Sequence, residues 1–424
     1  MSADFSASTK LWGIDRRVLA LAVARMADAV GNSFLIIVLP LYVASEAVGG
    51  RVFGLPASMI AGVVLALFGI ASSIAQPLAG GLSDRLGRRK IFVLGGLVVL
   101  GAVNLAFAVA TVYWHLFLLR VLQGLAAAFT ITASLAIVNE VSDAGSRGGN
   151  MGVYNSFRLI GFGTGPILAS ILLEMGPFVL PGGAEITGFE ATFGVAAGTA
   201  FLGTAMVGLL VQDPDTTEPA SRRLALRIWD RSTPGWRLDT IFALGLATLV
   251  MAACMALLSA IEPEVNARLN QGPFLFAVEF VALIAALAAV QPVVGRASDR
   301  VGRKPFILIG LLALIPTTLL QGLVQTPGQM IGIRVLQGGA GAFIFAPALA
   351  LAGDHTEKGQ SGAQLSVLTV AFGLGIATGQ LMAGFFVQFG FVVPFAVGSV
   401  CAAGGTLLVL TQVDAAEQPV KVKR

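Results

Sequence analysis

The sequence predicts an all-α membrane protein with twelve transmembrane helices in two six-helix halves. Of its 424 residues, 56% are hydrophobic and only 12% are charged, and the mean hydropathy is +0.85. In soluble domains about a quarter of the residues are charged, and a single aqueous core stops growing near about 250–300 residues. The apolar residues also form twelve runs of spanning length, and several motifs recur at nearly constant spacing. Lipid is therefore the expected surrounding of most of this surface.

The twelve apolar runs are predicted to be helices, because a helix satisfies its own backbone hydrogen bonds in lipid and about 20 residues cross the bilayer. The runs of the first half are Val18–Val43, Ala57–Ala79, Ile91–Thr111, His115–Val138, Gly152–Leu173 and Ala191–Val211. The runs of the second half are Thr240–Ala260, Phe274–Val294, Phe306–Val324, Met330–Gly353, Gly362–Val387 and Phe391–Leu410. We therefore predict an N-terminal half at residues 1–211, a linker at 212–239 and a C-terminal half at 240–424.

Basic residues are concentrated in alternate loops, and this asymmetry predicts the orientation in the membrane. One set of loops contains Arg16, Arg17, Arg85, Arg88, Arg89, Lys90, Arg147, Arg296, Arg300, Arg303, Lys304 and Lys358, whereas the opposite loops contain only Arg51 and Arg268. By the positive-inside rule, the basic loops and both termini are cytoplasmic. Residues 1–14 contain no apolar core, so we expect no cleavable signal peptide. The expected location is the cell membrane, that is, the inner or plasma membrane, with multiple passes.

The predicted linker contains a basic amphipathic piece, Arg222–Arg231. This piece fits a helix that lies on the anionic cytoplasmic leaflet. A solvated linker helix without a role fits equally well. The formal net charge of +4 is assigned to topology and not to nucleic-acid binding, because the basic residues lie in short loops between apolar runs.

The two halves repeat each other. Residues 80–90 recur as residues 295–305, and the Arg-Val-Leu-Gln-Gly stretch at Arg120 recurs at Arg334, which is 214 residues later (334 − 120). The same spacing relates residues 161–165 to 375–379 and Glu140 to Asp354. The chain is therefore predicted to be a duplication of one six-helix unit in parallel orientation.

The repeated loop contains the motif G-x-x-x-D-R-x-G-R-[KR]. The motif is matched by Gly80, Asp84, Arg85, Gly87, Arg88 and Arg89, and again by Gly295, Asp299, Arg300, Gly302, Arg303 and Lys304. With this motif in both halves, the chain resembles the major facilitator superfamily over essentially its whole length, and its motifs are most similar to those of the twelve-helix drug:proton antiporters. The resemblance implies alternating access around a midplane site, a small-molecule substrate and protons as the coupling ion.

The motif also implies a charge latch at the cytoplasmic helix ends. A carboxylate that ends one helix can bind loop arginines through charge-assisted hydrogen bonds or sit at the partly positive N-terminus of another helix. The candidate latch residues are Asp84, Arg85, Arg88, Glu140, Asp299, Arg300, Arg303 and Asp354. The resemblance implies that such a latch locks the outward-facing state. Positive-inside topology alone would explain the arginines but not Asp84, Gly87 and their copies.

A stretch in the fourth run resembles a motif of proton-coupled members of the family. Arg120, followed by Gln123 and Gly124, matches the helix-four motif, in which the arginine is thought to shape the proton site. An arginine stays charged, so it is not itself the proton carrier. Snorkelling to the outer interface is the alternative for Arg120 and for its copy Arg334.

A glycine pattern in the fifth run resembles the helix-five motif of antiporters. Gly152, Gly161, Gly165 and Pro166 match it, but alanine and serine replace the last two glycines of the motif. In the family this motif distinguishes exporters from importers. The alternative is close helix packing around a proline bend, with no bearing on the direction of transport.

Charged residues inside the predicted spans are candidates for proton coupling or substrate binding, since a charge at the bilayer centre costs about 2.5–3.5 kcal/mol by insertion scales. Asp28 either exchanges protons or meets a cationic substrate, or it is neutralised by Arg25 on the same helix face. Glu279 is a second candidate carboxylate, with a position at the outer interface as the alternative. Arg158 could pair with an acid, bind an anionic substrate or join the latch.

Three functions are compatible with these features. The first is proton-coupled efflux of small apolar or amphipathic compounds. The second is proton-coupled uptake or facilitated diffusion of a polar metabolite, such as a sugar or an organic anion, and the third is a non-transporting sensor on the same fold. A cavity with few polar residues and an inward Asp28 favours the first function, whereas several Asn, Gln and Arg residues favour the second.

Several chemistries are disfavoured by the sequence. It contains no G-x-x-x-x-G-K-[ST] loop, no H-E-x-x-H and no G-x-S-x-G, so neither ATP-driven pumping nor hydrolysis is expected. The two cysteines, Cys254 and Cys401, lie in apolar runs and indicate no disulfide framework or metal site. We expect a monomeric protein without enzymatic activity, cofactor or metal, whose partners are its substrate, protons and the lipid bilayer.

Overall fold

The computed structural model describes residues 10–11, 14–45, 47–50, 52–142, 147–179, 181–213, 228–229, 237–354 and 361–413. Most of the predicted linker 212–239, including nearly all of the amphipathic piece Arg222–Arg231, lies outside the described residues. Its place on the membrane surface therefore stays a prediction.

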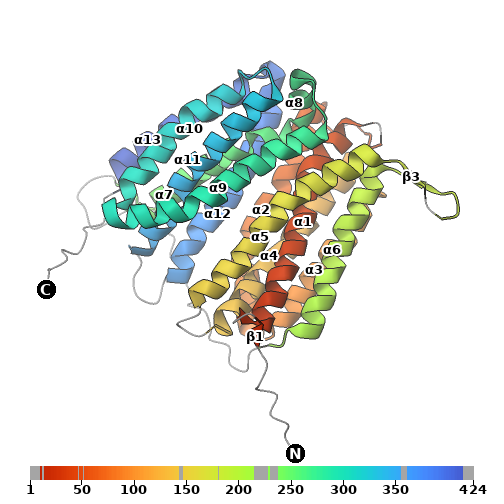
Figure 1. Ribbon diagram of the computed structural model, residues 1–424, viewed down its shortest axis with the longest axis horizontal. Coiled ribbons are helices and arrows are strands. Elements are labelled where there is room, and N and C mark those ends of the chain that lie inside the picture. The colour runs from red at the N-terminus through yellow and green to blue at the C-terminus, as the bar shows by residue number, and fades with distance from the viewer. Residues whose placement is uncertain are drawn as a thin grey trace, which may run out of the picture. The chain divides into compact units, whose positions relative to one another are not determined.

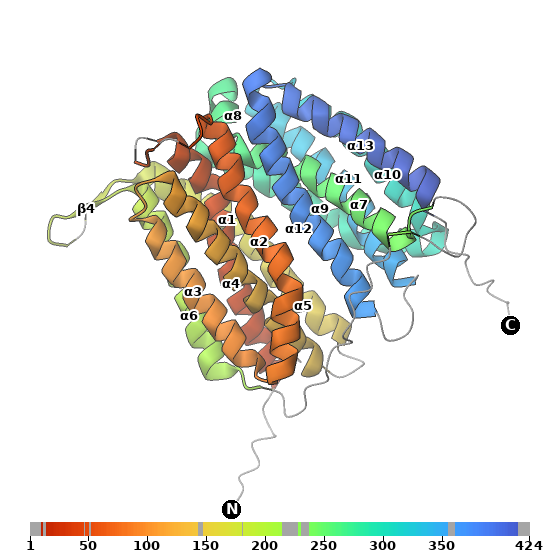
Figure 2. The ribbon, with the colours of Figure 1, turned by 180° about the vertical axis from the view of Figure 1, so that it is seen from behind.

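Twelve helices in the described part of the chain are long and apolar enough to cross a membrane, which confirms the predicted fold class. In the first half they are α1 (Arg16–Ala44), α2 (Ala57–Leu86), α3 (Arg89–Phe107), α4 (Tyr113–Glu140), α5 (Arg147–Met175) and α6 (Gly188–Leu210). In the second half they are α7 (Thr240–Ala256) with η1 (Leu257–Ala260), α9 (Pro273–Val301), α10 (Arg303–Gln321), α11 (Pro327–Asp354), α12 (Ser361–Phe386) with η2 (Val387–Phe389), and α13 (Val393–Gln412). Figures 1 and 2 show them from opposite sides.

The small elements lie between these helices. Strands β1 (Lys10–Leu11) and β2 (Ile14–Asp15) pair just before α1, and β3 (Phe178–Val179) pairs with β4 (Glu185–Ile186) in a hairpin that extends beyond the helices (Figure 1). A short helix, α8 (Glu262–Leu269), joins η1 to α9. Apolar runs alone did not predict α8, because it is too short and too polar to register as a span.

Helices α2 and α9 extend one to two turns beyond the predicted apolar runs. Both end at a glycine with positive φ, Gly87 at 63° and Gly302 at 109°, whose N–H bonds the carbonyl oxygen of Ser83 or Ser298. A residue with a side chain rarely adopts this backbone conformation, whereas glycine adopts it without strain. The residues of the repeated motif thus form the last turn of each of these helices and include the glycine that ends it.

The chain forms two compact units. One comprises Met1–Val52 and Ile70–Ala220, and the other comprises Phe53–Gly69 and Ser221–Arg424. The start of α2 therefore belongs to the C-terminal unit, in contrast to a continuous N-terminal half at residues 1–211. The reason is close packing on α12, because a Cβ at Gly62 would lie 2.6 Å from the carbonyl oxygen of Gln380.

Helix pairing is the same within each half. In the N-terminal half α1 packs against α5 and α6, and α3 packs against α4 and α6. In the C-terminal half α7 packs against α12 and α13, and α10 packs against α11 and α13. The core of this second half is a cluster of buried aliphatic side chains from α7, α10, α11, α12 and α13, which includes Leu244, Leu311 and Ile344. The repeat seen in the motifs is therefore also a repeat of helix packing.

Candidate functional site

The first helix contains a buried ion pair. Arg25 and Asp28 lie on one face of α1, and the Arg25 Nη1 donates to Asp28 Oδ2. Both side chains are buried, and Arg25 Nε has no hydrogen-bond partner among the described residues. The structure therefore brings this predicted pair together, because residues three apart meet on a helix. A buried charge pair of this kind is sensitive to the loss of either partner.

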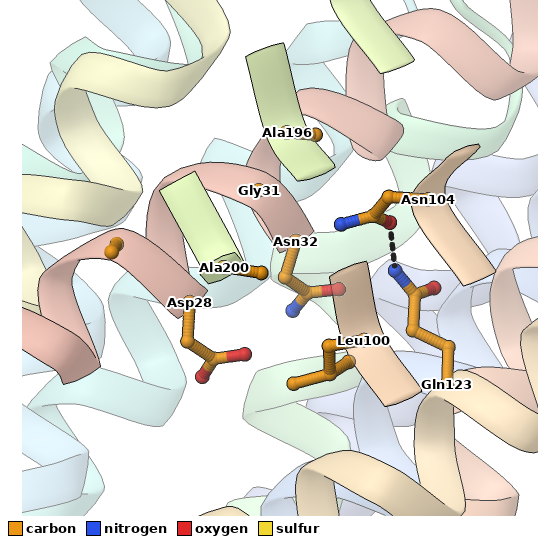
Figure 3. Close-up of a pocket in the computed structure, with 9 residues that line it drawn as sticks. Asp28, Gly31, Asn32, Leu100, Asn104, Gln123, Ala196 and Ala200 are labelled. Atoms are coloured by element: carbon orange, nitrogen blue, oxygen red, sulfur yellow. Dashed lines mark hydrogen bonds between the residues drawn. The ribbon is translucent and has the colours of Figure 1, made fainter. Parts of the chain in front are cut away.

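Asp28 also lines a small pocket within the N-terminal unit, whose surface is mostly apolar and which is too narrow in this conformation to hold a ligand (Figure 3). The pocket is lined by Ala27, Asp28, Gly31 and Asn32 from α1, Leu100 and Asn104 from α3, Gln123 from α4, and Ala196 and Ala200 from α6. Asp28 and Asn32 are one turn apart and project from the same face of α1, toward Leu100 (Figure 3). The site therefore combines a carboxylate and amides with an apolar, small-residue wall.

Two of the pocket amides belong to a buried hydrogen-bond chain. Arg120 Nη1 donates to Gln123 Oε1 at 2.7 Å, and Gln123 Nε2 donates to Asn104 Oδ1 at 3.0 Å. All three side chains are buried, so in this structure Arg120 bonds inside the protein and does not snorkel. The helix-four arginine therefore fixes the amides that form one wall of the pocket.

The C-terminal half repeats this chain but lacks the acidic pair. Arg334 Nη1 donates to Gln337 Oε1 at 2.7 Å, and Gln337 Nε2 donates to the backbone oxygen of Cys254 at 3.1 Å. Gly375 packs on Leu249 and Ala252 of α7 just as Gly161 packs on Met26 and Ala29 of α1. In this register Thr248 and Met251 occupy the positions of Arg25 and Asp28. The ion pair is therefore specific to the N-terminal half.

Arg158 lies near the ion pair without contacting Asp28. Its Nε donates to Asn155 Oδ1 at 3.0 Å, and its guanidinium lies 5.8 Å from the Phe162 ring centroid. Arg25 and Arg158 are close enough for their charges to interact, and both act on the hydroxyl of Tyr154. That hydroxyl is 2.5 Å from Ser134 Oγ. Arg158 thus adds positive charge beside the ion pair. This contribution differs from the three roles predicted for it, which stay predictions.

The charge latch in the N-terminal half is centred on Arg89, which is buried at the first position of α3. Its Nη2 lies 3.1 Å from Asp84 Oδ1 and 2.5 Å from Glu140 Oε1. The predicted latch arginines Arg85 and Arg88 are exposed, and neither forms an ion pair among the described residues. The structure thus brings Asp84 and Glu140 together but through a different arginine.

In the C-terminal half the corresponding arginine is Arg303, at the first position of α10. It lies 3.2 Å from Asp299 and 2.5 Å from Asp354. Arg300 is exposed. The two arginines differ in motif position because one residue, Gly302, separates α9 from α10, whereas two residues separate α2 from α3. Asp299 is 57% exposed, whereas Asp84 is 17% exposed, so the first set of contacts is the more buried.

The glycines of α5 have different surroundings. A Cβ at Gly161 would lie 2.4 Å from the carbonyl oxygen of Met26, and one at Gly165 would lie 1.9 Å from Ser33 Oγ. Gly152 has open space around it. Pro166 is buried within α5. Gly161 and Gly165 therefore let α5 approach the α1 segment that contains Asp28, and Gly152 has no such part.

Glu279 does not belong to this site. It is fully buried in the second turn of α9, in the C-terminal unit, where Gln271 Nε2 donates to its Oε1 at 2.9 Å. Glu279 is therefore buried in protein, and its depth in the membrane stays a prediction. Among the described residues no group of three or more His, Cys, Asp or Glu side chains could hold a metal ion.

Sequence reasoning missed the two asparagines of the pocket, Asn32 and Asn104. Both are amides inside apolar runs, and Asn32 follows Asp28 by one helical turn. A polar side chain in a membrane span is itself a signal of function. Attention to intramembrane amides as well as charges would have found both.

The comparison with known proteins assigns the family. The Major Facilitator Superfamily model matches residues 21–244 and 240–424, which is nearly the whole chain. The chain therefore belongs to the major facilitator superfamily and is a multi-pass membrane transporter of small molecules.

Two bacterial relatives have the same name. The proteins named multidrug resistance protein MdtG from Salmonella arizonae and from Salmonella choleraesuis are each 25% identical to this chain over 376 residues, covering 87% of either chain.

Solved structures show the same fold. A bacterial homolog of the human lysosomal transporter Spinster has a TM-score of 0.73 at 13% identity, covering 93% of this chain and 94% of its own. The human organic anion transporter MFSD10 has a TM-score of 0.67 at 18% identity, covering 93% and 99%. At these identities the likeness concerns the fold alone.

Proposed function

We propose that this transporter is a proton-coupled exporter of small apolar or amphipathic compounds that works by alternating access. The observation that carries the proposal is the buried Arg25–Asp28 pair at the wall of a pocket. An ionisable pair inside a membrane protein is expensive to maintain and commonly marks an ion or substrate pathway. The similarity to proteins named for multidrug resistance supports the export direction.

Coupling would follow from competition at Asp28. A proton that arrives on Asp28 neutralises the carboxylate and weakens its hold on Arg25. A substrate that binds beside Asp28 would favour the ionised carboxylate, either directly through a positive group or by leaving the ion pair intact. Proton and substrate then occupy the site in turn, which gives exchange when each favours a different conformation of the transporter.

The side chains that line the pocket support the proposal of an amphipathic substrate. Three amides line the pocket. Gln123 bonds both Arg120 and Asn104, which leaves it little capacity for a ligand, whereas Asn104 uses only its Oδ1, as acceptor from Gln123. Asn32 is the amide for which the described residues give no hydrogen-bond partner. Asn32 therefore adds a polar contact beside Leu100 and the alanines, which are apolar.

Uptake or facilitated diffusion of a polar metabolite is the second candidate function. The amide-rich wall favours it, since several amides were the expected mark of a polar substrate. It would require Gln123 to exchange its present hydrogen bonds for bonds to the substrate, or Asn104 to donate to the substrate through its Nδ2.

Transport in inside-out vesicles tests the proposed function. Vesicles that contain the protein and an acidic interior should take up fluorescent amphipathic compounds and release protons, as followed with a pH-sensitive dye. Vesicles without the protein, and vesicles treated with a protonophore, are the controls. Sugar or organic-anion transport without any proton-linked uptake of amphipathic compounds would overturn the proposal in favour of the second candidate.

We further propose that the protein lies in the cell membrane as a monomer with both termini in the cytoplasm. The basic loops around Arg88 and Arg303 support this orientation through the positive-inside rule.

A further inference from the structure

The short helix α8 lies at the end of the C-terminal half where η1 ends and α9 begins (Figure 2). The arginine-rich loop lies at the other end of α9, so α8 is at the end remote from it. Glu262 at the start of α8 and Glu279 in α9 are both 0% exposed. Two fully buried carboxyl groups in one small region need a physical explanation, because buried charges are costly.

A continuous hydrogen-bond chain joins the two carboxyl groups. Asn266 Nδ2 donates to Glu262 Oε1 at 3.5 Å, and Gln271 Nε2 donates to Asn266 Oδ1 at 3.2 Å. The same Gln271 nitrogen donates to Glu279 Oε1 at 2.9 Å. The chain crosses from α8 to α9 through the connection between them, and its two ends are the two acids.

Each acid uses only one of its oxygens. Glu262 Oε2, Glu279 Oε2 and Gln271 Oε1 are buried and have no hydrogen-bond partner among the described residues. If both buried carboxyl groups were ionised, hydrogen bonds to both oxygens of each group would be expected. Protonation of one group removes the larger part of the cost of burying two charges.

The charges around the pair favour unequal protonation. The positive charge of Arg334 in α11 acts on Glu279, and Glu279 in turn acts on Glu262. On α8 itself, Glu264 is partly buried and Arg268 is exposed, with its Nε donating to the Val324 carbonyl oxygen at 3.4 Å. The η1 segment packed against α8 has no ionisable side chain. Of the two acids, Glu279 therefore has the nearby positive charge, which favours its ionised form and leaves the proton on Glu262.

We propose that Glu262 and Glu279 form a carboxyl pair that binds one proton, held on Glu262, with Asn266 and Gln271 as the hydrogen-bonded connection to Glu279. The pair would be a second proton site, in the other half from Asp28 and at the end remote from the arginine-rich loops. Its contribution to coupling rests on the proposed function, whereas the binding of the proton does not.

The electrostatics of Glu262 agree with this geometry. Burial, and secondarily the negative charge of Glu279, raises the pKa of Glu262 well above its ordinary value of 4.5, although the hydrogen bond from Asn266 lowers it. The folded chain thus binds this proton more tightly than the unfolded chain. The resulting stability is fully present below the ordinary pKa and is lost as the pH rises toward and through the folded-state pKa.

A metal cation fits this site less well than a proton. Sodium or calcium would need several further oxygen ligands beyond two carboxylates and an amide, and Ca²⁺ takes about 6–8. The positive charge of Arg334 would also oppose a bound cation. Addition of NaCl or CaCl2 to the purified protein at constant ionic strength is therefore expected to leave its melting temperature unchanged.

Infrared difference spectroscopy on the purified full-length protein tests the proposal, because a neutral carboxyl group has a C=O band that a carboxylate lacks. At about pH 7, where an ordinary glutamate is ionised, Glu262→Gln should remove one neutral-carboxyl band. Glu185→Gln, at an exposed carboxyl in the hairpin, should remove none. The melting temperature of the wild type should fall relative to Glu262→Gln as the pH rises from about 5 to about 8.

A second variant keeps the test decisive if Glu262→Gln does not fold. Asn266→Leu removes the hydrogen bond that favours ionised Glu262, so the wild-type carboxyl band should persist to higher pH in this variant. A carboxylate band lost in Glu262→Gln, or a band whose pH dependence is unchanged in Asn266→Leu, would overturn the proposal. Neither readout depends on transport, so failure of the export function would appear separately in the vesicle experiment.

Discussion

At the scale of single residues, the position of an arginine relative to a helix start decides whether it forms the ion pairs of the predicted latch. Arg88 and Arg89 are neighbours, yet Arg88 is exposed and Arg89 binds both Asp84 and Glu140. The motif pairs Arg88 with Arg303 by spacing, whereas the structure pairs Arg89 with Arg303 because both begin a helix. Sequence spacing alone does not reveal where the turn between two helices ends.

Arg89→Ala and Arg88→Ala form a matched test of the latch. Loss of Arg89 leaves Asp84 and Glu140 without their shared cation, and a hydrogen bond to a charged group contributes about 1.5–3 kcal/mol. If the latch stabilises one transport conformation, Arg89→Ala should lower the transport rate about tenfold or more, since about 1.4 kcal/mol corresponds to a factor of ten. Arg88→Ala should transport at the wild-type rate, as measured in vesicles at equal protein amounts.

The carboxylates of the two halves should respond in the same order as their burial. Asp84→Asn should impair transport more than Asp299→Asn, because Asp299 is mostly exposed and exposed ion pairs contribute about 0–1 kcal/mol. Normal transport by Arg89→Ala, Asp84→Asn and Asp299→Asn would show that the latch has no functional role.

The acidic pair was partly predictable. Spacing placed Arg25 and Asp28 on one helix face, and the structure has them in contact. Sequence spacing did not predict which residues of other helices line the pocket. Asn104 and Gln123 come from α3 and α4, which meet α1 only through tertiary packing. The burial of Glu279 was unpredictable for a similar reason. Glu279 is buried near α8, and no apolar run predicted that helix.

At the scale of helices, glycine spacing controls how closely α5 approaches α1. Gly161 and Gly165 are one turn apart and face Met26, Val30 and Ser33. The C-terminal half repeats this with Gly375 and Gly379 against α7. Without a hydrophobic drive between helices in lipid, such close backbone contact is a principal source of helix association.

Gly161→Ala and Gly152→Ala test this packing with the same chemical change. A methyl group at Gly161 meets a backbone oxygen at 2.4 Å, which cannot move without shifting α1, whereas Gly152 has open space. We expect Gly161→Ala to lower the free energy of unfolding by about 1–3 kcal/mol, the usual cost of overpacking. Gly152→Ala should be neutral in thermal melting in detergent. Equal melting temperatures for both variants would contradict the packing account.

The sequence predicted the twelve membrane spans better than it predicted the ends of the helices. The twelve spans follow from run length alone, because a bilayer imposes a minimum length that a soluble fold does not. The helix ends were less predictable, since hydrogen bonding continues beyond the apolar run until a glycine such as Gly87 ends it.

At the scale of the whole molecule, the proposed orientation places the basic loops in the cytoplasm. Arg88→Cys and Ala184→Cys, in a background without Cys254 and Cys401, test this orientation. Ala184 is an exposed residue of the β3–β4 turn and avoids Gly182 and Gly183, whose positive φ angles disfavour a side chain. An impermeant thiol reagent on intact cells should label only Ala184→Cys, and labelling of both positions would contradict the topology.

The two halves have the same packing but different charge, and this asymmetry is the basis of the functional account. The N-terminal half has a buried ion pair at its pocket, where the C-terminal half has Thr248 and Met251. Duplication explains the common fold, and the differences between the copies are where coupling chemistry is expected. This part of the site was not predictable from the repeats, because the register of α1 with α7 differs from that of the motifs.

Concentrative transport in proteoliposomes tests whether Asp28 couples protons to transport. With an imposed proton gradient, the wild type should accumulate an amphipathic substrate against its gradient, whereas Asp28→Asn should not. Asp28→Asn should still exchange neutral substrates downhill. The double variant R25Q/D28N, which leaves no unpaired buried cation, should behave like Asp28→Asn if the missing proton carrier is the cause. Uphill transport by Asp28→Asn at the wild-type rate would contradict the account.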